Sequence, residues 1–212
     1  MKKTRKRDGC IAGALLLAFA IFTLLVRTVD VAPIGPRGSF VGFATLNGFV
    51  HRCTGVHMLL YTITDWLGLV PIAVALGFAI FGLLQWIARR RLWRVDRSIL
   101  VLGGFYLLVI ASYILFEYVV VNRRPVLIDG FLEVSYPSST TLLVTTVMPT
   151  AIMQLRARIG GAILRRGVTL LILAFTVFMV VGRLISGVHW LTDIIGGSIL
   201  SAGLVMTYRA LR

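Results

Sequence analysis

The chain has 212 residues, of which 58% are hydrophobic and 14% are charged, and its mean hydropathy is +0.92. Soluble globular domains carry about 25% charged residues, so an ordinary soluble domain is excluded. The formal charge is +14, but the basic residues cluster between long apolar runs, so we expect no nucleic-acid partner. Without repeats or linkers, the sequence predicts an integral membrane protein with one domain, residues 1–212.

Six apolar runs are long enough to cross a membrane, which takes about 20 helical residues. They lie at residues 10–29, 58–88, 98–121, 139–156, 165–186 and 188–208. The first run follows the basic segment MKKTRKR, but it is too long for a cleaved signal peptide and no small-residue cleavage site follows it, so we expect a retained anchor. The prediction is an all-α bundle of six transmembrane helices.

Basic residues indicate the orientation of these helices. Lysine and arginine cluster at the N-terminus, between the second and third runs, between the fourth and fifth runs, and at the C-terminus. Because cytoplasmic loops are enriched in these residues, we predict that both termini are cytoplasmic. Six arginines fall on the other side: Arg27, Arg37, Arg52, Arg123, Arg124 and Arg183. They indicate an anion-binding site at the outer leaflet, and a small basic membrane chain without organelle signals fits a bacterial plasma membrane.

The segment between the first two runs, residues 30–57, is too short and too interrupted by proline and glycine to span a membrane. Its apolar residues follow a rough helical period, so we predict a short helix lying on the outer membrane surface. His51, Arg52 and His57 could lean from this helix over a site. The simpler interpretation is that they are ordinary residues of a membrane interface.

The segment GRLISGVHWLTDIIGG, residues 182–197, places three ionisable residues in an apolar part of the chain: Arg183, His189 and Asp193. Each costs roughly 2.5–3.5 kcal/mol inside a membrane helix, so a function is expected. On a helix, His189 and Asp193 are four residues apart and share a face, which lets the carboxylate accept a hydrogen bond from one ring nitrogen. The other nitrogen is then free to act.

Polar residues in the other runs have simpler explanations. Asp65 and Glu117 lie near the outer ends of the second and third runs, where we expect them to pair with the outer arginines, because pairing lowers the cost of a charge in the membrane. Small residues in the last run, Gly196, Gly197 and Ser201, predict close helix packing.

Three segments predicted on the outer side are EYVVVNRRP at 117–125, SYPSSTT at 135–141 and GRLISGVHWLTD at 182–193. Their order and spacing resemble the type 2 phosphatidic acid phosphatase superfamily of membrane lipid phosphatases. The family pattern is K-x6-R-P, then P-S-G-H, then S-R-x5-H-x3-D. The third motif is kept at Arg183, His189 and Asp193, with Gly182 in place of the serine.

The first two motifs are kept only in part. The first retains Arg124 and Pro125, but Glu117 stands where lysine is expected. The second retains Pro137 and Ser138, with Ser139 in place of glycine and Thr140 in place of histidine. The resemblance covers roughly the C-terminal half of the chain.

Phosphate chemistry explains why such residues are needed. Arginines that fork onto phosphate oxygens stabilise the negative charge, which suits Arg124 and Arg183. A neutral His189 nitrogen can attack phosphorus while Asp193 fixes the tautomer. Ser138, Ser139 and Thr140 would lie at the start of a helix. Their backbone N–H groups could bind an anion there, because the N-terminus of a helix carries a partial positive charge. The resemblance implies that the histidine becomes transiently phosphorylated. We expect no metal or cofactor, because no cluster of carboxylates or histidines in the sequence has the spacing of metal ligands.

The departures from the pattern affect the expected substrate. In the family the second-motif histidine protonates the leaving alkoxide, which Thr140 cannot do, and losing a general acid costs about 10²- to 10⁴-fold. Glu117 places a negative charge where the family has the positive charge of lysine. Arg123 could neutralise Glu117 or take the place of the missing cation. Glu117 is itself a conceivable acid if burial raises its pKa. A diphosphate expels a weaker base than a monoester does, so we predict a preference for lipid diphosphates such as polyprenyl diphosphates.

Three alternatives to a lipid phosphatase remain open. A catalytically degraded relative would bind a lipid phosphate as a sensor or transport partner. A phosphotransferase would pass the phosphate from His189 to an acceptor other than water. A channel or transporter unrelated to the family would place polar residues through several helices, and this sequence has few near the membrane midplane.

Overall fold

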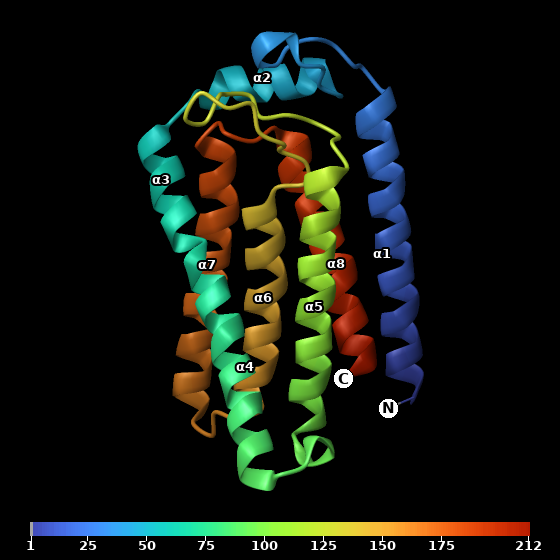
Figure 1. The fold of residues 1–212 in the computed structure, drawn as a ribbon, viewed down its shortest axis with the longest axis vertical. Helices are drawn as coiled ribbons and strands as arrows, with labels where there is room; N and C mark the ends of the chain where they lie inside the picture. Colours follow the sequence, from blue (N-terminus) through green and yellow to red (C-terminus); the bar gives the residue numbers. More distant parts are fainter. Residues whose placement is uncertain (1) are drawn as a thin grey trace.

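The structure is a computed structural model that describes residues 2–212. It is a bundle of long helices, with one short helix across an end (Figure 1). The eight α-helices are α1 (Lys2–Thr28), α2 (Ala44–Thr54), α3 (Met58–Leu67), α4 (Leu69–Arg89), α5 (Arg97–Tyr118), α6 (Ser139–Arg156), α7 (Ala162–Ile185) and α8 (Leu191–Leu211). Two short 3₁₀ helices are η1 (Pro36–Gly38) and η2 (Leu92–Arg94). The predicted all-α class is therefore confirmed.

Five segments are long and apolar enough to cross a membrane: Lys3–Thr28, Met58–Arg89, Arg97–Tyr118, Ala162–Ile185 and Leu191–Leu211. The chain is thus a multi-pass membrane protein. The remaining predicted span coincides with α6, whose lower hydropathy reflects its threonines. Because α6 contacts α4, α5, α7 and α8, its polar groups face protein instead of lipid. Its role as a sixth span stays a prediction.

The second predicted span is formed by two consecutive helices, α3 and α4, which are joined at Gly68 (Figure 1). Pro71 lies in the first turn of α4 and has no N–H to donate, so the helical hydrogen bonding is interrupted just before it. The Gly68 N–H still follows the helical pattern of α3 and donates to the carbonyls of Thr64 and Asp65, both at 3.0 Å. The predicted run 58–88 is therefore one candidate membrane span that contains two helices.

The start of α8 differs from the prediction. We expected a helix from residue 188, which would have placed His189 on it, but α8 begins at Leu191. Gly187 has a φ of 70°, which turns the chain before the helix, and the Asp193 carboxylate accepts a hydrogen bond from the Trp190 N–H at 2.9 Å. This bond caps the helix at Trp190, so His189 lies in the preceding loop.

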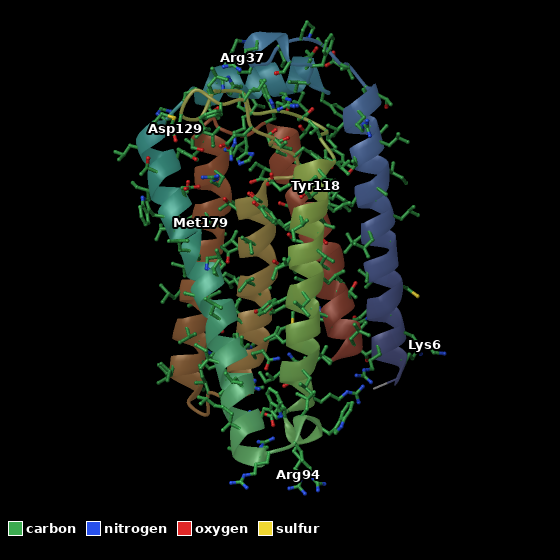
Figure 2. All side chains as sticks on the ribbon, in the orientation of Figure 1. Lys6, Arg37, Arg94, Tyr118, Asp129 and Met179 are labelled. Atoms are coloured by element: carbon green, nitrogen blue, oxygen red, sulfur yellow. The ribbon has the colours of Figure 1, made fainter. Side chains whose placement is uncertain are left out.

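The two ends of the bundle differ in their charged residues. Both termini lie at one end (Figure 1), and Lys6 and Arg94 lie at that end too, whereas Arg37 and α2 lie at the other (Figure 2). Termini on the same side agree with an even number of passes. The assignment of that side to the cytoplasm follows from the arginine and lysine bias and stays a prediction.

Large apolar side chains cover the outside of the bundle. Leu107 on α5 is 69% exposed, and Leu171 on α7 is 71% exposed. Such extensive apolar exposure is unfavourable in water but suits a surface that contacts hydrocarbon.

Small residues of α8 allow neighbouring segments to approach it closely. The N-terminal helix α1 packs along α8, where a Cβ added to Gly203 would lie 2.8 Å from the Leu16 side chain. Gly196 packs against the Tyr136 ring, which an added Cβ would approach to 2.6 Å. The predicted close packing around small residues of the last helix is thus confirmed.

The loop before His189 depends on Gly187. Its φ of 70° favours glycine, and an added Cβ would lie 2.0 Å from the Gly55 carbonyl oxygen. The His51 Nε2 atom is 3.1 Å from the Gly187 oxygen, which attaches this loop to α2. Neither the backbone angle nor the neighbouring backbone can accommodate a methyl group here without displacement.

We therefore expect Gly187→Ala to destabilise the protein by about 1–3 kcal/mol from backbone strain alone, with a further loss from the steric clash. Thermal unfolding of the purified protein in detergent measures the effect. The control is Gly167→Ala in α7, where nothing lies within 4 Å of the added Cβ. Equal stability of Gly187→Ala and wild type would contradict the expectation.

Candidate active site

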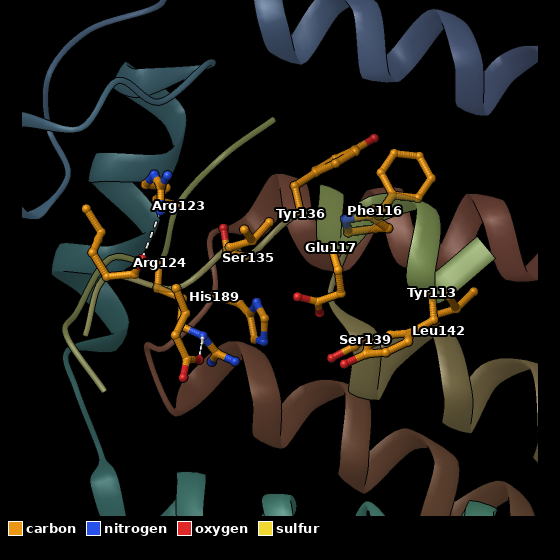
Figure 3. Close-up of a pocket in the computed structure, with 14 residues that line it drawn as sticks. Tyr113, Phe116, Glu117, Arg123, Arg124, Ser135, Tyr136, Ser139, Leu142 and His189 are labelled. Atoms are coloured by element: carbon orange, nitrogen blue, oxygen red, sulfur yellow. Dashed lines mark hydrogen bonds and ion pairs between the residues drawn. The ribbon is translucent and has the colours of Figure 1, made fainter. Parts of the chain in front are cut away.

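A cavity of about 440 Å³ opens near the end of the bundle that carries α2. Its walls come from the end of α5, the loop 119–138, the start of α6 and His189 (Figure 3). The loop is held in a hairpin-like shape, since Arg124 and Glu133 pair through a backbone hydrogen bond of 3.0 Å and Ser135 donates to the Asn122 carbonyl at 3.0 Å. Segments far apart in the sequence therefore meet at one polar hollow.

His189 lines this cavity. Its Nδ1 atom is 3.6 Å from Asp193 Oδ2, longer than a hydrogen bond, and within residues 2–212 neither ring nitrogen has a hydrogen-bond partner. Burial lowers the pKa of His189 well below its usual value, and the charges of Arg124 and Arg183 lower it further. The imidazole is therefore neutral at neutral pH and holds a free electron pair, as a nucleophile requires.

Asp193 is fully buried behind the histidine. Its Oδ2 accepts the Trp190 N–H bond that caps α8, and its Oδ1 lies 3.4 Å from the Asn122 amide nitrogen. The same Asn122 accepts a bond from the Gly42 N–H at 3.3 Å. These contacts hold the carboxylate rigidly beside the imidazole.

Asn122 and Asn47 are structural residues that the sequence analysis missed. Asn47, on α2, accepts the Thr192 N–H at 3.2 Å and donates to the Thr192 hydroxyl at 2.9 Å. Both asparagines are buried. They attach α2 and the loop 119–138 to the start of α8, and single asparagines outside any motif carried no signal that could have identified them.

Arg124 lines the cavity, and its Nε atom is 2.9 Å from Glu133 Oε2. Its Nη1 atom is buried and has no hydrogen-bond partner within residues 2–212. A guanidinium that is buried without satisfying all its donors is suited to receiving an anion. Glu133 is a neighbour that the motif comparison did not include.

Arg183 is 1% exposed and lies beside the site without forming part of the cavity wall. Its Nη1 atom is 3.4 Å from Asp65 Oδ1, so the predicted pairing of Asp65 with an outer arginine is confirmed. The ring of Tyr61 lies near both guanidinium groups, 5.0 Å from Arg183 and 6.0 Å from Arg124. Tyr61, which no motif indicated, thus lies close to both cations.

The second motif lies at the start of α6, as predicted, but its residues point in different directions. The Ser138 N–H donates to the Asp193 carbonyl at 3.1 Å, so it is occupied. Its hydroxyl caps α6 by accepting from the Thr141 N–H at 3.4 Å. Ser139 lines the cavity, whereas Thr140 does not. The predicted anion site is thus reduced to the remaining amides of the first turn.

Thr140 instead lines a second, apolar cavity of about 910 Å³ between α4, α5 and α6. Tyr113 and Ser139 belong to the walls of both cavities, so the two are adjacent. The apolar cavity extends as far as Trp86 and Leu92, near the opposite end of the bundle. The polar cavity is therefore next to a long apolar groove.

The two predicted auxiliary residues both line the polar cavity. Arg123 donates to the Leu132 carbonyl at 2.9 Å. Glu117 extends from the last turn of α5 toward His189, which faces it across the cavity (Figure 3). The position where the family pattern has lysine therefore places a carboxylate beside the candidate nucleophile.

In this bundle of membrane-spanning helices, a polar cavity lined by Arg124 and His189 lies next to an apolar groove. Residues 119–212 match the family model of the PAP2 superfamily. The resemblance seen in the three motifs is confirmed, since this C-terminal part of the chain matches the family model.

The fold is similar to a solved structure described as the first transmembrane PAP2 type phosphatidylglycerolphosphate phosphatase from Bacillus subtilis. The TM-score is 0.54, with 20% sequence identity over 94% of this chain and 93% of that chain. At this identity the likeness supports the fold. Comparison with curated proteins gives no match.

Proposed function

We propose that this protein is a lipid phosphate or diphosphate phosphohydrolase that acts through a phosphorylated His189 at the outer face of a bacterial plasma membrane. The observation that carries the proposal is the position of His189, which is neutral, supported by Asp193 and part of the wall of a cavity that Arg124 also lines. Each of these groups has a defined task in phosphoryl transfer.

In the first step the Nε2 atom of His189 attacks phosphorus. A P–N bond forms while the bond from phosphorus to the leaving oxygen breaks, and the electron pair of that bond goes to the leaving group. Asp193, 3.6 Å from Nδ1, stabilises the positive charge that develops on the ring. Arg124 holds the phosphoryl oxygens, while Arg183 adds positive charge from outside the cavity wall.

Lipid diphosphates are the substrates that this site favours. Of the three histidines in the sequence, His51 and His57 contact backbone carbonyls, at 3.1 and 2.8 Å, and neither lines the cavity. Thr140 faces the groove. With no second imidazole to donate a proton, expulsion of an alkoxide is slow, whereas a phosphate leaving group needs little protonation.

The apolar groove supports a lipid as substrate. Its walls adjoin the polar cavity at Tyr113 and Ser139, so a phosphate beside His189 leaves its hydrocarbon chain next to α4, α5 and α6. This arrangement keeps the tail out of water while the headgroup reacts.

The test compares phosphate release from a polyprenyl diphosphate and from phosphatidic acid, using purified protein in detergent with a metal chelator present. We expect kcat/KM for the diphosphate to be higher by about 10²-fold or more, the low end of what a missing general acid costs. Faster release from phosphatidic acid would contradict the substrate preference. Loss of activity with the chelator would contradict metal independence.

A binding protein without catalysis is the second candidate, because Glu117 places a negative charge in the cavity where the family pattern has a cation. It predicts that the wild type binds the lipid diphosphate but releases no phosphate. The release assay combined with lipid binding to the same preparation separates the two functions.

A further inference from the structure

Two carboxylates line the polar cavity, and they differ in their contacts. Glu133 is engaged by Arg124, with Oε2 at 2.9 Å from Nε. Glu117 is exposed, and among the side chains described, residues 3–212, none forms an ion pair with it, so its predicted pairing with an outer arginine is wrong. Its carboxylate points into the cavity toward His189 (Figure 3). Glu117 is thus a solvent-accessible proton acceptor facing the candidate nucleophile.

The proposed reaction has a second step that needs such a group. Once phosphate is attached to His189, water must attack phosphorus, and a base that removes a proton from the water accelerates this attack. Neither His51 nor His57 lines the cavity. Thr140, which stands where the family pattern has histidine, lines the apolar groove. The cavity wall therefore offers Glu117 as the carboxylate without a cationic partner.

We propose that Glu117 is the general base that activates water for hydrolysis of phosphorylated His189, an inference that rests on the proposed function. In this step the water oxygen forms a bond to phosphorus as the P–Nε2 bond breaks. The electron pair of that bond returns to the imidazole, and the water proton passes to the Glu117 carboxylate. Inorganic phosphate leaves, and Glu117 returns its proton to solvent.

The two departures from the family pattern then belong to one arrangement. Replacing histidine by Thr140 removes a proton donor that a diphosphate does not need in the first step. Replacing lysine by Glu117 adds a proton acceptor for the second step. The negative charge is tolerated because Arg123 and Arg124 line the same cavity, and they offset its repulsion of the phosphate.

The test follows each half of the reaction with a polyprenyl diphosphate labelled in its terminal phosphate. Rapid mixing and quenching measure formation of polyprenyl monophosphate, labelling of the protein and release of inorganic phosphate. In Glu117→Gln we expect monophosphate to form in the first turnover at close to the wild-type rate. We expect labelled protein to accumulate and steady-state phosphate release to fall by about 10²-fold or more.

The matched control is Asp129→Asn, a carboxylate-to-amide change at an exposed loop residue at the same end of the bundle (Figure 2), outside the cavity wall. It should behave as wild type. Wild-type phosphate release by Glu117→Gln, or an equal loss of both half-reactions without labelled protein, would overturn the role of Glu117. Absence of monophosphate, label and phosphate release in wild type would instead overturn the proposed function.

Discussion

His189→Ala is expected to reduce phosphate release from a lipid diphosphate to background, a loss of about 10⁴-fold or more, because the variant lacks the atom that attacks phosphorus. No other side chain in the described cavity wall combines a neutral nitrogen with a supporting carboxylate. Labelling of the protein from the substrate should disappear together with phosphate release. Both are measured on protein purified in detergent, with thermal unfolding as the check on folding.

The matched control for this substitution is His57→Ala. His57 is exposed and its ring contacts the Thr54 carbonyl at 2.8 Å, away from the cavity wall. Phosphate release should be unchanged in this variant. Activity that survives in His189→Ala would show that the nucleophile is another group and would remove the basis of the proposed mechanism.

Arg124→Ala is expected to reduce kcat/KM by about 10²- to 10³-fold, as removal of one group that stabilises transition-state charge usually does. It should also change the pH dependence. The reaction needs neutral His189, so the rate falls as the pH drops through the pKa of that residue. Because the charge of Arg124 lowers this pKa, its removal raises the pKa, and the acid limb of the pH profile moves to higher pH.

Arg37→Ala provides the control for charge in general. Arg37 lies at the same end of the bundle, where its guanidinium donates to the Gly130 carbonyl at 3.0 Å (Figure 2). The variant loses one positive charge at a residue outside the cavity wall, so the pH profile should stay in place. An acid limb that does not move in Arg124→Ala would contradict the electrostatic coupling between Arg124 and His189.

Membrane spans were predictable because a helix that crosses the hydrocarbon core must be apolar over about 20 consecutive residues. Five of the six predicted runs correspond to segments long and apolar enough to cross a membrane, and residues 139–156 coincide with α6. The three motifs were readable for a related reason, since arginine, histidine and aspartate are costly in such segments and therefore indicate a site. Their order along the chain placed them in the PAP2 superfamily, which the family model confirms.

The sequence could not predict which cavity each polar side chain would line. His189 and Asp193 were expected on one helix, yet His189 lies in a loop, because the bond from Trp190 to Asp193 starts α8 later. Thr140 and Ser139 are neighbours in the sequence, but Thr140 lines the apolar groove and not the cavity. Asn122, Tyr61 and their contacts had no signal in the sequence.

The sequence by itself thus determined a multi-pass membrane protein, its helices and the residues that make it PAP2-like. These properties depend on local composition, because the membrane acts on each apolar segment separately. Only the tertiary structure decided which polar groups meet, including Arg183 with Asp65 and Glu117 opposite His189 (Figure 3). Such meetings depend on how each helix is rotated in the bundle, which is determined by packing between segments that are distant in the chain.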